Sequence, residues 1–192
     1  SGKICTHWET PQGVFENEYL AAYQGDLVAA RFSAPAGLLD LDISLRLPGG
    51  PGPFGRISMA KSSHTLEKTP ELFKLAFAYN PEYGRRGYVS VIRFIPQGGT
   101  VTVTDDGVCV RGADRLVVLA KAVRVEHDFS FGCENAIADE FEKAASDFDS
   151  YVAGNLTVLG ERMSRSQLTL GKEEDYVLSG EELLRLSHSQ EE

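Results

Sequence analysis

The segment Thr100-Val-Thr-Val-Thr104, Asp105-Asp106-Gly107, Val108-Cys-Val-Arg111 places two alternating runs on either side of a short turn. Valine and threonine favour extended backbone, and Asp-Gly between two such runs is typical of a tight hairpin. We expect Gly107 to supply the positive φ angle that a short turn needs. This hairpin is the clearest element of the chain, and it predicts an antiparallel β protein.

Further strands are expected on both sides of this hairpin. They cover residues 14–23, 26–33, 39–47, 71–79, 86–95 and 115–125. Gln24-Gly25 between the first two predicts a second tight turn, and residues 39–47 alternate between apolar and polar side chains, as in a half-buried strand. The apolar run in 115–125 indicates a strand buried on both faces. About eight to ten closely spaced strands without intervening helices predict an antiparallel β-sandwich or barrel, and we expect the sandwich.

The periodicity changes after residue 134. Phe141, Phe148, Val152 and Leu156 recur at steps typical of an amphipathic helix, which we expect over residues 139–163 with a break at Gly154 and this apolar face toward the sandwich. Residues 167–170 could form a last short strand. Beyond them, Ser179 is positioned to cap a short helix.

Charge separates the same two regions. The formal net charge is −9, and residues 131–192 hold 5 Lys/Arg against 14 Asp/Glu, which is 5 − 14 = −9. We therefore divide the chain into a β-sandwich at 1–130 and an acidic helical linker at 131–192. The acidity argues against nucleic acid as a partner. No run approaches the roughly 18 apolar residues of a membrane span, so no membrane association is expected.

Motifs that carry chemistry are absent from the sequence. It has no GxSxG, Walker, GxGxxG or HExxH pattern, and no histidine or cysteine pair at metal-ligand spacing. We interpret Asp105-Asp106 as residues of a hairpin turn, and His127-Asp128 as polar residues at the end of a strand. We therefore expect no catalytic residue, no metal and no cofactor. The candidates for ligand contact are two aromatic side chains, Trp8 and Tyr23, because flat exposed rings can stack on a glycan.

Several segments carry a family resemblance. Glu18-Tyr-Leu-Ala-Ala-Tyr-Gln-Gly-Asp-Leu-Val-Ala-Ala-Arg-Phe32 resembles paired strands in the N-terminal domain of glycoside hydrolase family 95, the α-L-fucosidase and α-L-galactosidase family. Residues 97–119 give the most specific match, with Gly98-Gly99, Asp106-Gly107 and then Gly112-Ala-Asp-Arg-Leu-Val-Val-Leu119. Residues 148–170 are similar to the linker helices of that family. Its opening strand has no counterpart, so we expect the chain to begin inside the sandwich.

The resemblance implies a role without catalysis. Family members act through an α/α toroid that follows the linker, and no residue of this chain matches its catalytic positions. The leading hypothesis is a sandwich and linker fragment of a bacterial glycoside hydrolase, with its own downstream catalytic domain as partner. A free-standing carbohydrate-binding module and a protein interaction domain unrelated to sugars remain open. The sequence does not distinguish a cytoplasmic from an exported protein.

Overall fold

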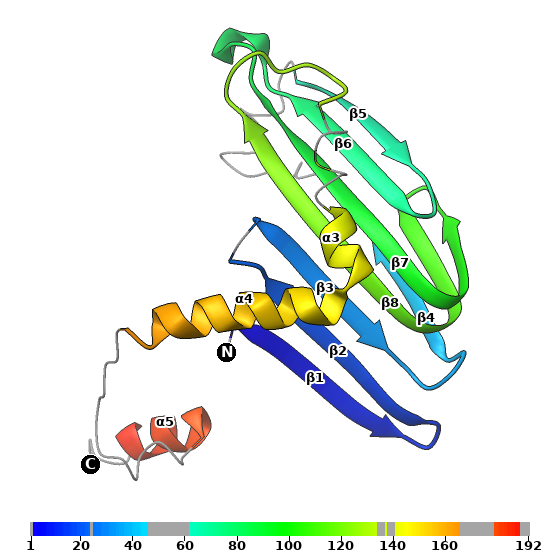
Figure 1. Ribbon diagram of the computed structural model, residues 1–192, viewed down its shortest axis with the longest axis vertical. Coiled ribbons are helices and arrows are strands. Elements are labelled where there is room, and N and C mark those ends of the chain that lie inside the picture. Colours follow the sequence, from blue (N-terminus) through cyan, green and yellow to red (C-terminus); the bar gives the residue numbers. More distant parts are fainter. Residues whose placement is uncertain are drawn as a thin grey trace. The chain divides into compact units, whose positions relative to one another are not determined.

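The computed structural model describes residues 2–23, 25–45, 62–133, 137, 141–165 and 179–188. The chain forms two compact units, Ser1–Leu159 and Gly160–Glu192. The first unit contains the sheet and most of the helical residues (Figure 1). The last two residues of the strand expected at 39–47, and the short strand expected at 167–170, lie outside the described residues.

The first unit is built on eight described strands (Figure 1). Their bounds are β1 Lys3–Thr10, β2 Gly13–Ala21, β3 Leu27–Ser33, β4 Leu39–Ser44, β5 Ser63–Lys68, β6 Leu72–Ala78, β7 Gly87–Val103 and β8 Gly107–Val125. A single turn of 3₁₀ helix, η1 at Pro81–Tyr83, joins β6 to β7. The helices are α3 Phe141–Ser146, α4 Phe148–Met163 and α5 Gly180–His188.

All the described strand pairs are antiparallel, in the order β1-β2-β3-β8-β7-β6-β5. β4 also pairs with β8, so β3 and β4 follow one another along the same edge of that strand: β3 lies opposite residues 115–121 and β4 opposite residues 107–113. The expected fold class, a mainly antiparallel β fold followed by C-terminal helices, is confirmed. The two predicted hairpins also form, because β2 pairs with β3 and Val103 lies opposite Val108.

β8 shows why a long apolar run becomes a central strand. Leu116 and Leu119 are fully buried and Val117 is 8% exposed, although neighbouring side chains along a strand point to opposite faces. Both faces of β8 are therefore covered, as the sequence predicted.

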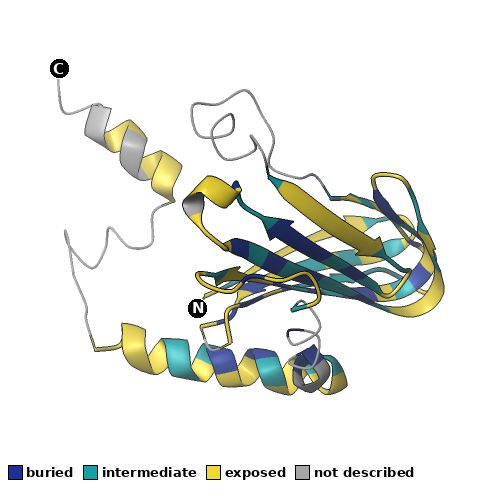
Figure 2. Cartoon of the chain, turned by 90° about the horizontal axis from the view of Figure 1, so that it is seen from above, coloured by how far each residue is buried: buried dark blue, intermediate teal, exposed yellow. Residues whose placement is uncertain are grey.

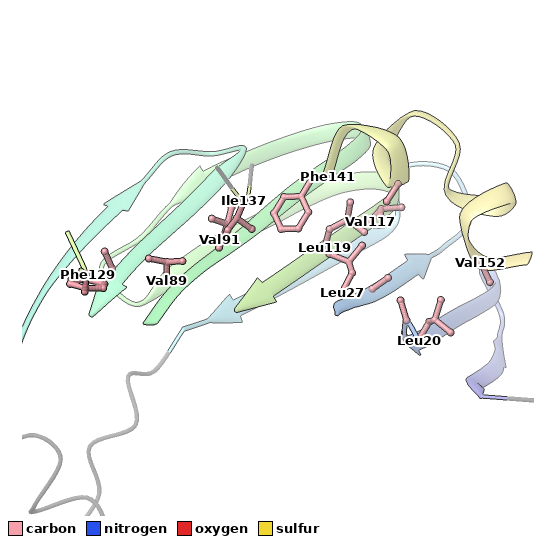
Figure 3. Close-up of a cluster of buried hydrophobic side chains, with 14 residues drawn as sticks. Leu20, Leu27, Val89, Val91, Val117, Leu119, Phe129, Ile137, Phe141 and Val152 are labelled. Atoms are coloured by element: carbon pink, nitrogen blue, oxygen red, sulfur yellow. The ribbon is translucent and has the colours of Figure 1, made fainter. Parts of the chain in front are cut away.

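A hydrophobic cluster on one face of the sheet holds α3 and the first part of α4 against it. Figure 3 shows Phe141 of α3 among Val91, Val117 and Leu119, and Val152 of α4 beside Leu20. Phe141 is fully buried, Val152 is 8% exposed, and Phe148 and Leu156 pack against the same cluster. The four side chains expected to face the sheet therefore do so.

A second cluster lies on the opposite face. It joins Phe94 and Leu116 to Val108 and Val110, which lie further along the same β7–β8 ribbon, and to Leu39 of β4. The ribbon changes register between Gln97 and Gly98. This irregularity lets its distal half, together with β4, cover the second face of the sheet.

The helical segment breaks at a different residue from the expected one. α3 ends at Ser146 and α4 begins at Phe148, whereas Gly154 lies inside α4. Asp147 is the cause, because its carboxylate accepts a hydrogen bond of 3.0 Å from the backbone N–H of Ser150. Such a cap starts a new helix, and a glycine on an open helix face does not have to end one.

The explanation for Gly107 is also corrected. The described glycines with positive φ do not include Gly107. A β-carbon there would instead lie within 3.0 Å of three main-chain atoms of β4, the carbonyl carbon and oxygen of Ile43 and the Cα of Ser44. The residue must be small because another strand passes directly against it.

The second unit is described at residues 160–165 and 179–188. Ser179 caps α5 as expected: its hydroxyl lies 3.3 Å from the N–H of Glu182, and the Glu182 carboxylate accepts a 2.8 Å bond from the Ser179 N–H. This reciprocal arrangement is a capping box. No helix in the described part of the chain has the length and apolar character needed to cross a bilayer.

Candidate functional site

Trp8, the first candidate for glycan contact, lies on the edge strand β1. Its side chain is 45% exposed. It stacks on Phe15 of β2, the residue directly opposite, with ring centroids 5.6 Å apart and an angle of 11° between the ring planes. The two rings form a small flat aromatic surface near the β1 edge of the sheet.

Tyr23, the second candidate, follows β2 and is 48% exposed. Eight residues separate it from Phe15, which pairs with Trp8, and a strand rises about 3.3 Å per residue. The two candidates thus lie roughly 26 Å apart along the strand direction. The structure does not bring Trp8 and Tyr23 together into one binding platform.

Other large apolar side chains are exposed near Trp8. Ile4 lies opposite Tyr19 in the register, and the two are 67% and 39% exposed. Val28 of β3 is 56% exposed. Strand alternation puts these three residues on the same side as Trp8 and opposite to the side that α4 covers. We call Ile4, Trp8, Tyr19 and Val28 the open face (Figure 2 shows exposed residues in yellow).

The other side of the same three strands carries an ion-pair network. One carboxylate oxygen of Glu18 accepts a hydrogen bond from Lys3 Nζ and the other accepts one from Arg31 Nε. Arg31 also binds Asp149 of α4, and its guanidinium carbon lies 5.0 Å from the ring centre of Phe148. This network, Lys3–Glu18–Arg31–Asp149, connects the first three strands to the start of α4.

Electrostatics keep this network charged. Burial alone would raise the pKa of Glu18, but the hydrogen bonds from Arg31 and Lys3 outweigh burial and hold its pKa below the usual value. Glu18 is 6% exposed, so its charge would be costly without these partners. The network is therefore best understood as a structural connection between sheet and helix.

Cys5, Glu16 and Glu18 come close enough to suggest metal ligands. Both carboxylate oxygens of Glu18 already accept hydrogen bonds from cationic side chains. A cation would have to displace Lys3 and Arg31, and Cys5 and Glu16 are exposed. We therefore assign no metal to this group.

A pocket of about 260 Å³ lies at the β6–β7 turn. Its walls include the rings of Tyr79, Phe129 and Phe131, with Arg85 and Arg86 also in the lining. No carboxylate is among its described lining residues.

The aspartates singled out in the sequence, Asp105, Asp106 and Asp128, lie in turns. Asp105 and Asp106 lie in the β7–β8 turn, where their carbonyl oxygens accept bonds from Lys68 Nζ and the Leu45 N–H. Asp128 has a φ of 53° and lies 3.9 Å from Arg85, so it belongs to the turn after β8. The three cysteines form no disulfide bond.

Comparison with known proteins gives a fold likeness. No protein-family model and no curated protein matches the sequence. Among solved structures, the protein described as "Putative kojibiose phosphorylase from human microbiome" resembles this chain with a TM-score of 0.54 and 11% sequence identity. The likeness covers 83% of this chain but 22% of that one. The chain thus spans about a fifth of the length of the structure it matches.

Proposed function

We propose that this chain is the non-catalytic sheet-and-helix part of a larger sugar-active enzyme. The observation that carries the proposal is the unequal coverage of the fold likeness, 83% of this chain against 22% of a phosphorylase chain. We infer that catalysis takes place in another part of that enzyme and that this domain supports it.

The chemistry of the described residues supports the same reading. Hydrolysis of a glycosidic bond uses two carboxyl groups, about 5–10 Å apart, that face the same bond. Here Glu18 is held by two cationic groups, and the described pocket has no carboxylate in its lining. The described residues therefore contain no pair that we assign to acid and base roles.

The more specific proposal concerns the reaction of the whole enzyme. The resemblance of residues 18–32 and 97–119 favours an α-L-fucosidase-like hydrolase, and the fold likeness is to a phosphorylase. We favour the hydrolase, because the resemblance involves ordered motifs in this sequence. Its partner would then be the enzyme's own downstream catalytic domain, and a bacterial source fits this family.

Activity measurements test both the non-catalytic role of this chain and the hydrolase assignment of the whole enzyme. The 192-residue chain should release no sugar from aryl α-L-fucosides, and it should not consume kojibiose in the presence of phosphate. The protein encoded by the complete gene should hydrolyse the fucoside. Turnover by the chain alone that disappears when one carboxylate is replaced would overturn the non-catalytic role. Phosphorolysis by the complete protein would overturn only the hydrolase assignment.

A second function is favoured by one observation, the exposed Trp8–Phe15 stack on β1 and β2. We propose weak glycan contact there as the alternative, and calorimetric titration with fucosylated and galactosylated oligosaccharides is the test. Binding should be lost in Trp8→Ala and kept in Tyr23→Ala, because the two side chains lie far apart. Binding that neither variant changes would exclude this surface.

A further inference from the structure

The pocket at the β6–β7 turn, which we call the turn pocket, is formed by two segments of the chain. Tyr79 and Pro81 line it from the turn, and Phe129, Ser130 and Phe131 line it from the segment that follows β8. Phe129 is 7% exposed and lies at one end of the hydrophobic cluster (Figure 3), whereas Phe131 is 49% exposed. Their rings meet edge to face, with centroids 5.5 Å apart. One wall of the pocket is therefore anchored in the core, and another is open to solvent.

Main-chain contacts hold the two segments of the turn pocket together. The N–H of Phe129 donates a 3.2 Å hydrogen bond to the carbonyl oxygen of Arg85. The N–H of Tyr79 donates a 3.0 Å bond to the carbonyl oxygen of Arg86. A β-carbon at Gly87 would come within 3.0 Å of the Phe129 ring, so the glycine lets this ring lie directly against β7. The pocket is therefore part of the folded structure, and sites for small molecules are usually pre-formed in this way.

The turn pocket combines its aromatic walls with positive charge. Arg85 and Arg86 are both exposed, and both belong to the lining. Asp128 lies 3.9 Å from Arg85, but these two side chains are 90% and 72% exposed, and such a pair contributes little. Arg86 forms no ion pair with any residue that the structure describes. The pocket therefore favours an anion, and a guanidinium can hold a carboxylate through two parallel hydrogen bonds.

The size and the walls of the turn pocket indicate what else the ligand carries. Its volume of about 260 Å³ is slightly below the roughly 300–1,000 Å³ of typical small-molecule sites, so it suits a single ring better than a chain of sugars. Aromatic side chains offer flat apolar surfaces for such a ring. We propose that the turn pocket binds a carboxylate carried on a six-membered ring, with the ring against the aromatic side chains and the carboxylate at Arg86. Hexuronic acids and aromatic carboxylic acids share this chemistry.

Calorimetric titration of the chain with D-glucuronate and with benzoate tests the proposal. At least one of them should bind saturably, and the tighter of the two tells an acidic sugar from an aromatic acid. Two control ligands each lack one feature: methyl β-D-glucoside keeps the ring without the charge, and inorganic phosphate keeps the charge without the ring. Each should bind at least about fivefold more weakly than the better carboxylate. The test measures binding and not turnover, so its outcome is independent of the proposed function.

Substitutions assign the binding to this pocket. Arg86→Gln should weaken it at least about fivefold, because a charge-assisted hydrogen bond is lost, and Phe131→Ala should also weaken it by removing one wall. Asp128→Asn should strengthen it, since the competing carboxylate is removed and asparagine tolerates the φ of 53° at this position. Arg124→Gln is the matched control and should leave binding unchanged, because Arg124 is an exposed arginine outside the described lining.

Thermal melting of each variant separates loss of binding from loss of folding, because these side chains are exposed and the melting temperature should change little. Failure of both D-glucuronate and benzoate to bind would overturn the proposal. Equally tight binding of inorganic phosphate would do the same, because the ring would then contribute nothing. Binding that neither Arg86→Gln nor Phe131→Ala changes would place the ligand elsewhere on the chain and would also overturn it.

Discussion

Replacement of Gly107 by alanine tests how β4 is held against the β7–β8 ribbon. Gly107 is buried and lies opposite Ser44 in the β4–β8 register. The added methyl group would come within 3.0 Å of main-chain atoms of Ile43 and Ser44, which cannot rotate away as a side chain could. β4 would have to move and disturb the packing of Leu39, which is 4% exposed. Overpacking typically costs about 1–3 kcal/mol, and we expect the upper end, near 3 kcal/mol.

Thermal and urea unfolding measure this cost. For a chain of this length, 1 kcal/mol shifts Tm by about 2–4 °C, so Gly107→Ala should lower Tm by roughly 6–12 °C. Hydrogen exchange should also become faster in residues 39–44 than in residues 115–121, because β4 is displaced while the centre of β8 stays buried. Gly154→Ala is the matched control, since a β-carbon at Gly154 has no atom within 4 Å.

Asparagine distinguishes close approach from a positive φ angle. At a left-handed position asparagine is tolerated better than alanine. At Gly107 it should be at least as destabilising as alanine, because the conflict is with the main chain of β4. An unchanged melting temperature in Gly107→Ala, or clear rescue by Gly107→Asn, would refute the reasoning.

Further substitutions test the helices and their contact with the sheet. Phe141→Ala should lower the free energy of unfolding by about 3–5 kcal/mol, because the ring is fully buried, whereas Phe131→Ala should cost less than about 1 kcal/mol with a ring that is 49% exposed; equal losses in urea denaturation would contradict this. Glu18→Gln should cost about 2 kcal/mol at pH 7 by weakening charge-assisted hydrogen bonds. The pKa of Glu18 is lower in the folded protein than the usual 4.5, so its stabilisation is complete above pH 4.5 and is lost as the pH falls through the folded pKa. In acid unfolding, Glu18→Gln should therefore lose less free energy of unfolding below pH 4.5 than the unmodified protein does. Identical pH profiles of the two proteins would exclude the ion pair. Gly154→Ala should stabilise α4 by about 0.5–1 kcal/mol, because alanine favours a helix more than glycine does and a β-carbon there meets no other atom. A lower melting temperature would show that this position is in contact with other atoms.

Elements with a strong local pattern could be predicted from the sequence. The alternation in β4 and the apolar run of β8 each report how many faces of the strand are buried. β1 and β5 were not predicted as strands, because edge strands expose most of their residues and so carry little alternation. The helix break at Asp147 was not predicted, because it depends on a side-chain cap, whereas the expected break rested on the low helix propensity of Gly154.

The candidate site was less accessible to sequence reasoning. Trp8 and Tyr23 are both exposed, as a ligand contact requires, but their separation depends on the hairpin register. The importance of Gly107 depends on β4, a strand more than 60 residues earlier in the chain (107 − 44 = 63). The Glu18–Arg31 pair lies within the segment that resembles a known family, yet its connection to Asp149 spans 118 residues and no local pattern indicates it.

The pairing of β3 with β8 has a consequence for protein synthesis. Leu27 lies opposite Lys121, 121 − 27 = 94 residues later in the chain. At about 5–20 residues per second, a ribosome would need roughly 5–20 s to make that intervening segment. Hairpins form in microseconds, so β1, β2 and β3 can associate long before β8 exists. During that interval the β8-facing edge of β3 would be open in the nascent chain, and this is the point in the life of the protein at which a strand-binding chaperone could act.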